Sequence, residues 1–245
     1  MQAIIMAAGK GSRLGGATQD MPKSFIEING KRLIDYNLAL LRSNGINPII
    51  IVTGFCDKTF EDEFGGMQGI ELAYNPFYEQ TNVLGSFWVG MHYLKEDFLF
   101  IHADSICDPG LFHDLITTQG DIVLPVDYDT YNEEAMGVRC VGTQAVEISK
   151  KIPAGEADGE FIGYAKISKN VLRHIKEETT DLLRNKEFSE YFEAAIQRIM
   201  DKRQYDIVAI PTNGKFWAEI DFIEDYEKAV REIPGTLVQA AERWS

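Results

Sequence analysis

The feature that most constrains the fold is an apolar run at residues 3–8, Ala-Ile-Ile-Met-Ala-Ala, which stops at Gly9-Lys10-Gly11. The run has no helical spacing and no polar face, which is typical of a central strand that is buried on both sides. Such a strand needs helices above and below the sheet to cover it. Residues 3–8 therefore predict a parallel sheet inside an α/β domain.

Strands and helices alternate through the first hundred residues. Segments at 24–28, 48–53, 71–74 and 98–102 predict further strands, and segments with helical spacing at 33–45, 58–64 and 83–94 predict helices. Because parallel strands need a crossover connection, usually a helix, this order favours parallel pairing. We predict a three-layer, doubly wound, mostly parallel sheet of the Rossmann-like type.

The second half of the chain has a different pattern. Strands are predicted at 122–126, 136–141, 146–148, 206–210 and 216–220, helices at 169–177, 187–200 and 223–232, and a glycine-rich stretch lies at 153–163. The closely spaced strands after residue 121 predict a small antiparallel subregion that covers a site. No linker interrupts the chain, so we predict one domain over residues 1–245.

Charge and composition exclude several classes of protein. The 38 acidic and 24 basic side chains give a net charge of −14, which repels polyanions and excludes nucleic acid as a partner. No apolar run approaches the roughly 20 residues that cross a bilayer, so no membrane insertion is expected. Three scattered cysteines and the absence of a basic leader segment predict a cytoplasmic protein.

The loop after residues 3–8 combines small residues with positive charge. The residues whose backbone can approach phosphates closely are Ala7, Ala8, Gly9, Gly11 and Ser12. Arg13 and Lys23 add cationic side chains. A dinucleotide fingerprint needs a third glycine where this chain has Leu14, and a Walker loop needs Gly-Lys-Ser/Thr after four residues, so both fail. We predict a triphosphate cradle of another type; the alternative is an ordinary turn with surface cations.

Two aspartates follow predicted strands. Asp104 comes after residues 98–102 and Asp221 after residues 216–220, and open α/β sheets bind ligands at this edge. A Mg²⁺ ion that bridges phosphates takes one or two protein carboxylates, so both aspartates are predicted metal ligands. Glu219 precedes Asp221 by two residues on an extended segment and faces the same side. The alternative for each aspartate is a helix cap.

No other catalytic arrangement competes with these residues. None of the histidines has the spacing to a cysteine pair that a metal site needs. They are His92, His102, His113 and His174. A Gly-x-Ser-x-Gly nucleophile elbow is also absent from the sequence. The sequence therefore predicts neither a histidine-cysteine metal site nor a serine hydrolase.

Residues 1–25 resemble the N-terminal signature of the nucleotidyltransferases that activate sugar phosphates and phosphocholine. The shared pattern is a small-residue strand end, Gly-x-Gly-x-Arg-Leu, Thr18 and Pro22-Lys23, and one departure is Gly16-Ala17, where many members carry Pro-Leu. Asp104 and the segment 219–221 also fall in the family's order. The resemblance implies that residues 1–110 bind the nucleotide and residues 111–245 bind the acceptor. The implied catalytic residues are Arg13, Lys23, Asp104 and Asp221.

Length and local patterns make the chain more similar to the compact cytidylyltransferases for phosphocholine and 2-aminoethylphosphonate than to the longer sugar enzymes. The segment 75–82 and Ser86 resemble an asparagine-rich stretch near base and acceptor, which implies nucleotide contacts from Asn82 and Ser86. Residues 159–166 resemble the aminoethylphosphonate branch. Lys150 or Lys151 lies where relatives have a lysine that faces the acceptor phosphate. The residues predicted to bind the acceptor are Lys151, Tyr164 and Glu219.

The resemblance implies attack of an acceptor oxygen on the α-phosphorus of CTP, with release of pyrophosphate. The acceptor is already ionised near neutral pH, so alignment and charge neutralisation by Mg²⁺, Arg13 and Lys23 replace a general base. The favoured acceptor is 2-aminoethylphosphonate, and phosphocholine is the alternative. A sugar-1-phosphate or cofactor nucleotidyltransferase that uses another nucleotide, such as a molybdopterin guanylyltransferase, stays open, and so does a homodimer.

An acidic segment in the second half offers a place for an amine. The candidates follow a predicted strand on the acceptor side: Asp127, Asp129, Glu133 and Glu134, with Tyr128 and Tyr131 between them. A cationic acceptor needs a carboxylate or an aromatic wall. The alternative is an acidic loop in solvent.

Overall fold

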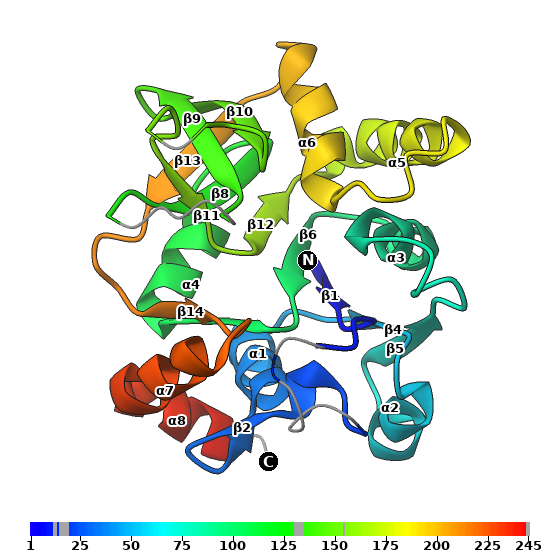
Figure 1. Ribbon diagram of the computed structural model, residues 1–245, viewed down its shortest axis with the longest axis vertical. Helices are drawn as coiled ribbons and strands as arrows, with labels where there is room; N and C mark the ends of the chain where they lie inside the picture. Colours follow the sequence, from blue (N-terminus) through cyan, green and yellow to red (C-terminus); the bar gives the residue numbers. More distant parts are fainter. Residues whose placement is uncertain (12–13, 15–19, 130–134, 154, 244–245) are drawn as a thin grey trace.

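A ten-stranded sheet forms the centre of the computed structural model (Figure 1), which describes residues 1–11, 14, 20–129, 135–153 and 155–243. From one edge to the other, its strands are β11 (Gly159–Phe161), β9 (Gly137–Val141), β10 (Gln144–Ser149), β13 (Ile207–Pro211), β8 (Ile122–Asp127), β12 (Tyr164–Ile167), β6 (Phe98–His102), β1 (Gln2–Met6), β4 (Ile49–Thr53) and β5 (Ile70–Tyr74). β1, the first strand in the sequence, therefore lies inside the sheet.

Strands β6, β1, β4 and β5 are all parallel, as the alternation of strands and helices predicts. Ile4 on β1 pairs with Ile50 on β4 and with Phe100 on β6. All five residues of β1 are buried. The prediction of a central strand from the uninterrupted apolar run is confirmed, because neighbours on both edges and helices on both faces leave no side of this segment exposed to water.

The other end of the sheet is mixed. β12 runs antiparallel between β6 and β8, β13 runs parallel to β8, and β9 pairs antiparallel with β10 and β11. Six of the seven strands from β13 to β5 therefore point in one direction, and the small antiparallel group lies beyond them (Figure 1). The predicted sheet is confirmed, except that β11 and β12 were not predicted as strands.

Helices cover both faces. One face packs against α1 (Leu33–Ser43), α2 (Asp57–Phe64), α4 (Pro109–Thr117), α7 (Ile223–Glu232) and α8 (Gly235–Glu242), and the other against α3 (Val83–Gly90), α5 (Lys169–Arg184) and α6 (Phe192–Asp201). Successive strand residues face opposite sides, so Ile5 joins the first core and Ile4 the second. The three-layer prediction is confirmed. None of the described helices has the length and apolar character needed to span a bilayer.

Two predicted elements are wrong in detail. Residues 24–28 are not one strand: η2 (Lys23–Phe25) is a 3₁₀ turn, and only β2 (Glu27–Ile28) is extended, paired with β3 (Lys31–Arg32). Successive residues from Ser24 to Ile26 are buried, which a surface strand does not allow but a turn folded onto the core does. Helix α5 continues past the predicted end at residue 177, because Thr179 and Leu182 extend its buried stripe.

Candidate active site

A cavity of about 300 Å³ opens at the edge of the sheet where β1 and β6 end. Ligands of open α/β sheets bind at the carboxyl ends of the strands, so this is the expected position for a site. The residues that line it are Met6, Ala7, Ala8, Gly9, Lys23, Ser24, Tyr78, Thr81, Asn82, Val83, Ser86, His102, Ala103, Asp104, Lys150, Tyr191, Glu219 and Asp221. Segments from both halves of the chain therefore contribute to one cavity.

Small residues bring the backbone to the floor of this cavity. Beyond β1, the Ala7 N–H donates to the Val52 carbonyl at 2.9 Å, so the chain stays between its neighbours. Ala7 and Ala8 are buried, and a Cβ at Gly9 would meet open space. Backbone amides without large side chains over them can approach phosphate oxygens closely. Ala7, Ala8 and Gly9 thus line the cavity, and their nucleotide-binding role stays a prediction.

Gly11 makes room for Lys23. The φ angle of Gly11 is +62°, and a Cβ at this position would lie 2.8 Å from the Lys23 Cβ. Both the left-handed backbone and the close approach favour glycine. The loop therefore packs directly on the lysine side chain. Ser12 and Arg13 lie outside the described residues, and their predicted roles stay predictions.

Lys23 joins the two predicted metal ligands. Its Nζ lies 2.6 Å from Asp104 Oδ2 and 2.5 Å from Asp221 Oδ1. Burial disfavours charge on each partner, but the mutual attraction outweighs it, so the pKa of Lys23 is raised above its ordinary value and the pKa of Asp104 is lowered. The lysine and the aspartate are therefore both charged near neutral pH.

A small two-stranded sheet brings Asp221 to Asp104 across more than a hundred residues of sequence. β7 (Ser105–Cys107) pairs with β14 (Trp217–Glu219), and the Ile220 N–H donates to the Asp104 carbonyl at 3.0 Å. Neither aspartate is the helix cap that the sequence left open. Asp108 accepts from the Gly110 N–H at the start of α4, and Asp225 accepts from the Phe222 N–H at the start of α7.

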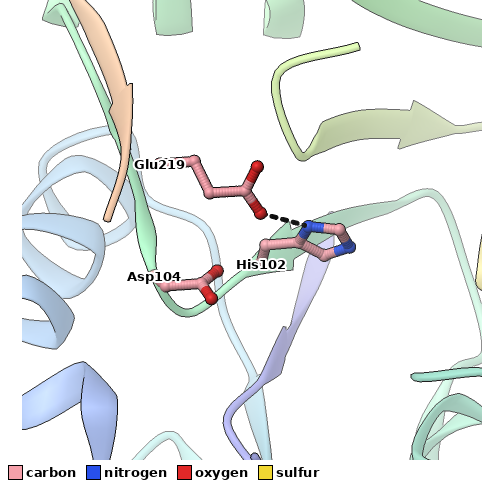
Figure 2. A group of neighbouring side chains, drawn as sticks. All are labelled: His102, Asp104 and Glu219. Atoms are coloured by element: carbon pink, nitrogen blue, oxygen red, sulfur yellow. Dashed lines mark ion pairs between the residues drawn. The ribbon is translucent and has the colours of Figure 1, made fainter. Parts of the chain in front are cut away.

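His102, at the end of β6, is a residue that the sequence analysis did not place in the site. Its Nδ1 lies 3.6 Å from Glu219 Oε1. Its Nε2 lies 3.4 Å from Oε1 of Glu193, a residue in the first turn of α6. Figure 2 shows the carboxylates of Glu219 and Asp104 beside the His102 ring. Burial alone would lower the pKa of His102, but the two glutamates raise it well above its ordinary value.

Asn82 and Ser86 line the side of the cavity formed by the start of α3. The Asn82 side chain accepts from the Val83 N–H at 2.8 Å and donates to the Ser189 carbonyl at 3.1 Å. Ser86 is buried and accepts from Asn75 Nδ2 at 3.0 Å. The helix start is thus held by its own cap and by a contact to a distant loop, and both predicted residues reach the cavity.

The two adjacent lysines on the acceptor side lie in different surroundings. Lys150 lines the cavity, with Nζ 4.7 Å from the centre of the Tyr191 ring. Lys151 is 84% exposed at its side chain, and its Nζ lies 3.5 Å from Glu190 on the surface. Lys151, which was predicted to bind the acceptor, does not line the cavity: successive residues after β10 point in different directions, and Lys150 is the one directed inward.

Tyr164 does not line the cavity, which corrects its predicted role in acceptor binding. It is fully buried on β12, and its hydroxyl donates to Asn37 Oδ1 at 2.5 Å and lies 2.9 Å from the Ser105 carbonyl. A central strand directs this side chain into the core under α1. Tyr164 therefore packs in the core beneath the site and does not reach the cavity.

The acidic segment after β8 is only partly exposed. Asp127 is buried and accepts from Trp217 Nε1 at 2.7 Å, while Glu133 and Glu134 lie outside the described residues. Glu160, which pairs with Asp127 across β11 and β8, is also buried. Burial and the negative charges of Glu219 and Asp127 raise the pKa of Glu160 to about 7. The negative charge near the acceptor side thus comes from strands as well as from the predicted loop.

His102, Glu193 and Tyr191 belong to the surroundings of the site without any sequence motif. His102 could have been found, because it is the last residue of an apolar strand and lies directly before the turn that carries Asp104. Tyr191 and Glu193 reach the site only through the packing of α6 against the sheet. No local pattern identifies them.

The fold and the site define a nucleotidyltransferase: a small-residue loop after the first strand, a lysine, and carboxylates at the carboxyl edge of a Rossmann-like sheet. Residues 3–181 match the family model of the MobA-like NTP transferase domain. The match covers well over half of the chain, so the protein belongs to this family. The predicted enzyme class is confirmed.

Curated relatives include cytidylyltransferases. The CTP:phosphoglutamine cytidylyltransferase of Campylobacter jejuni is 27% identical over 254 aligned residues, which cover 95% of this chain and 100% of that protein. The choline-phosphate cytidylyltransferase of Streptococcus pneumoniae is 34% identical over 117 residues, which cover 48% of this chain and 50% of that protein. The chain is thus similar to the first over its whole length and to the second over about half of it.

Solved structures share the fold. The CTP:phosphocholine cytidylyltransferase of Streptococcus pneumoniae superposes with a TM-score of 0.77 and 23% identity, covering 95% of this chain and 99% of that one. The inositol-1-phosphate CTP transferase of T. maritima superposes with a TM-score of 0.75 and 22% identity, covering 98% and 94%. These similarities support the predicted fold class independently of the sequence motifs.

Proposed function

We propose that this protein transfers CMP from CTP to a small phosphorylated or phosphonylated amine and releases pyrophosphate. The observation that carries the proposal is the contact of Lys23 with Asp104 and Asp221 in a cavity that Lys150 also lines. Two anionic substrates have to meet in this reaction. The cavity offers a separate cation to each of them, which opposes the repulsion between the substrates.

The division of the cavity supports separate positions for the two substrates. Ala7, Ala8 and Gly9 expose backbone on the side of β1, where the triphosphate would lie. Lys150 and Tyr191 line the cavity from other segments, the end of β10 and the start of α6, where the acceptor phosphate or phosphonate would lie. An oxygen of the acceptor would then attack the α-phosphorus from the side away from the leaving pyrophosphate, so alignment supplies much of the catalysis.

The donor set at Asp104 and Asp221 fits Mg²⁺. One nitrogen, Lys23 Nζ, lies within 2.6 Å of an oxygen from each aspartate, so one small cation can contact both. Mg²⁺ bound between them would polarise the α-phosphate and offset the charge on the pyrophosphate. Without the ion, Lys23 offsets the repulsion between the two carboxylates and keeps them in position.

Relatives and charge both bear on the choice of substrates. The names of the two curated relatives above specify CTP or cytidylyl transfer, which supports CTP here. Glu219 and the buried Asp127, together with the partly ionised Glu160, give the acceptor side a negative charge that favours a nitrogen cation on the acceptor. Among such acceptors we favour 2-aminoethylphosphonate, with phosphocholine as the alternative.

A substrate panel tests the proposal. Pyrophosphate release is measured with CTP, UTP, dTTP, ATP and GTP against 2-aminoethylphosphonate, phosphoethanolamine, phosphocholine, inositol-1-phosphate and glucose-1-phosphate, with and without Mg²⁺. CTP with a nitrogen-bearing acceptor is expected to exceed every other pair by about a hundredfold in kcat/KM. A preference for glucose-1-phosphate with UTP or dTTP would refute the proposal. Asp104→Asn run in parallel shows that the activity belongs to this site.

A further inference from the structure

Glu193 is a buried acid that the proposed reaction does not use. It is 1% exposed, and neither of its carboxylate oxygens has a hydrogen-bond partner among the residues that the structure describes. The polar group facing it is Nε2 of His102, at 3.4 Å. A buried carboxylate is costly unless it is paired, so this position of Glu193 calls for an N–H on His102 Nε2.

A histidine that binds a metal ion through one ring nitrogen commonly donates a hydrogen bond from its other ring nitrogen to a carboxylate. Such a carboxylate accepts the remaining ring N–H, selects the tautomer and fixes the orientation of the ring. In this protein the other nitrogen is Nδ1, which faces Glu219 and the cavity (Figure 2). His102 is therefore oriented with one nitrogen held by α6 and the other directed at carboxylates, so a metal ion that binds at Nδ1 would displace a proton from that nitrogen.

The donor atoms around Nδ1 are close enough to share one ion. Ligand atoms of His102, Asp104 and Glu219 all lie within 4.8 Å of one another, and Nδ1 is 3.6 Å from Glu219 Oε1. Neighbouring ligands around an ion with bonds of about 2.0–2.2 Å are separated by roughly 3–3.6 Å. Only a small movement of Asp104 or Glu219 is needed to complete the set.

We propose that His102 Nδ1, Asp104 and Glu219 form a binding site for a divalent transition-metal ion, with Glu193 as the positioning residue for His102. Imidazole nitrogen suits later transition-metal ions such as Zn²⁺ and Co²⁺, whereas Mg²⁺ prefers oxygen ligands. The site is therefore distinct in chemistry from the pair Asp104 and Asp221, with which it shares one carboxylate. It does not depend on CTP or on any acceptor, so its test uses the protein alone.

Co²⁺ titration of the metal-free full-length protein, without nucleotide, is the direct measurement, because a nitrogen ligand changes the visible spectrum of bound Co²⁺. Calorimetry gives the affinity and the stoichiometry. We expect one Co²⁺ per chain, bound at least about tenfold more tightly than Mg²⁺. His102→Gln should abolish the spectral change and weaken Co²⁺ at least about tenfold. Glu193→Gln should weaken Co²⁺ by about 10–100-fold.

Matched variants separate this site from other binding. His113→Gln, on the exposed side of α4, should leave Co²⁺ affinity unchanged, which excludes surface histidines as the ligands. Asp221→Asn should weaken Mg²⁺ and keep the Co²⁺ spectrum. Circular dichroism checks that each variant folds; if Glu193→Gln does not, His102→Gln carries the test.

The proposal is overturned if His102→Gln binds Co²⁺ as tightly as the unmodified protein, or if the unmodified protein shows no preference for Co²⁺ over Mg²⁺. In either case the contact from Glu193 through His102 to Glu219 is a structural ion-pair bridge. The substrate panel fails or succeeds independently, because it is measured with Mg²⁺ and nucleotide. A failed panel with a positive Co²⁺ titration would refute the proposed substrates and leave the metal site standing.

Discussion

The two sides of the cavity are built in different ways. On the side of β1, the backbone of residues 7–9 and the side chain of Asp104 follow directly from the ends of adjacent parallel strands. On the acceptor side, Lys150, Tyr191 and Glu219 come from the end of β10, the start of α6 and β14. The strand ends form a rigid part of the sheet. The acceptor side is an assembly of separate segments.

This difference predicts a division of labour. Groups at rigid strand ends hold reacting atoms in place, and their loss lowers kcat. Side chains from separate segments can be replaced without moving the strand ends. Their loss should therefore raise the KM of one substrate and leave the other KM unchanged. The variants below test whether the two sides differ in this way, and they run from the largest expected effect to the smallest.

The largest effect is expected at the strand ends. Asp104→Asn and Asp221→Asn should each lower kcat by about a hundredfold or more, because each removes one charge from the predicted Mg²⁺ site. Lys23 keeps the other aspartate as a partner in each variant, so the free energy of unfolding should change by no more than about 1–2 kcal/mol. Pyrophosphate release at saturating Mg²⁺ measures the first and urea unfolding the second. Near-normal turnover in either variant would remove that carboxylate from the metal site.

The next effect is expected on the acceptor side, where Lys150 and Lys151 form a matched pair. Lys150→Ala should raise KM for the acceptor about tenfold, because a charge facing the phosphate is lost, and should change KM for CTP less than about twofold. Lys151→Ala, whose side chain lies in solvent, should change neither value. Steady-state kinetics with each substrate varied in turn gives both constants. The opposite ranking of the two variants would restore the assignment that the sequence favoured.

A smaller effect, on stability alone, is expected beneath the site. Tyr164→Phe removes a buried hydroxyl that bonds to Asn37, so the free energy of unfolding should fall by about 1–2 kcal/mol, with KM for the acceptor unchanged. Urea unfolding measures the change. Tyr93→Phe, at an exposed tyrosine, is the control and should be neutral. A large rise in KM without loss of stability would return Tyr164 to the acceptor site.

The smallest effect is a dependence of stability on pH at Glu160. Its pKa in the folded protein is about 7 against an ordinary value of 4.5, so the folded state binds a proton more tightly than the unfolded state. The contribution of Glu160 to stability is therefore present below pH 4.5 and is lost as the pH rises to about 7.

Glu160→Gln removes the ionisable group and with it the loss of stability as the pH rises. Relative to the unmodified protein, the variant should gain up to about 1 kcal/mol in the free energy of unfolding between pH 5 and pH 7.5, measured by urea unfolding at both values. Exposed Glu156→Gln serves as the control and should show no such gain. A variant that becomes relatively less stable at the higher pH would mean that Glu160 is held as a carboxylate by a partner such as Lys150.

Sequence alone determined the parallel half of the sheet and the residues attached to its strand ends. The run at residues 3–8 identifies β1 because a strand that is buried on both faces has no polar position in its sequence. Asp104 was found for the same reason, because it follows an apolar strand of the parallel sheet. Asp221 was found as a residue after a predicted strand, although that strand, β14, pairs antiparallel with β7 outside the main sheet.

Only the tertiary structure decided which groups face the cavity from the other half. The choice between Lys150 and Lys151 depends on the direction of the chain after β10, and the burial of Tyr164 depends on the insertion of β12 between β6 and β8. The contact between Glu193 and His102 joins residues 91 positions apart in the sequence through the packing of α6. Local patterns report whether a segment is buried and with what period. They carry no information on which distant segment it meets, because that depends on how all the layers pack together.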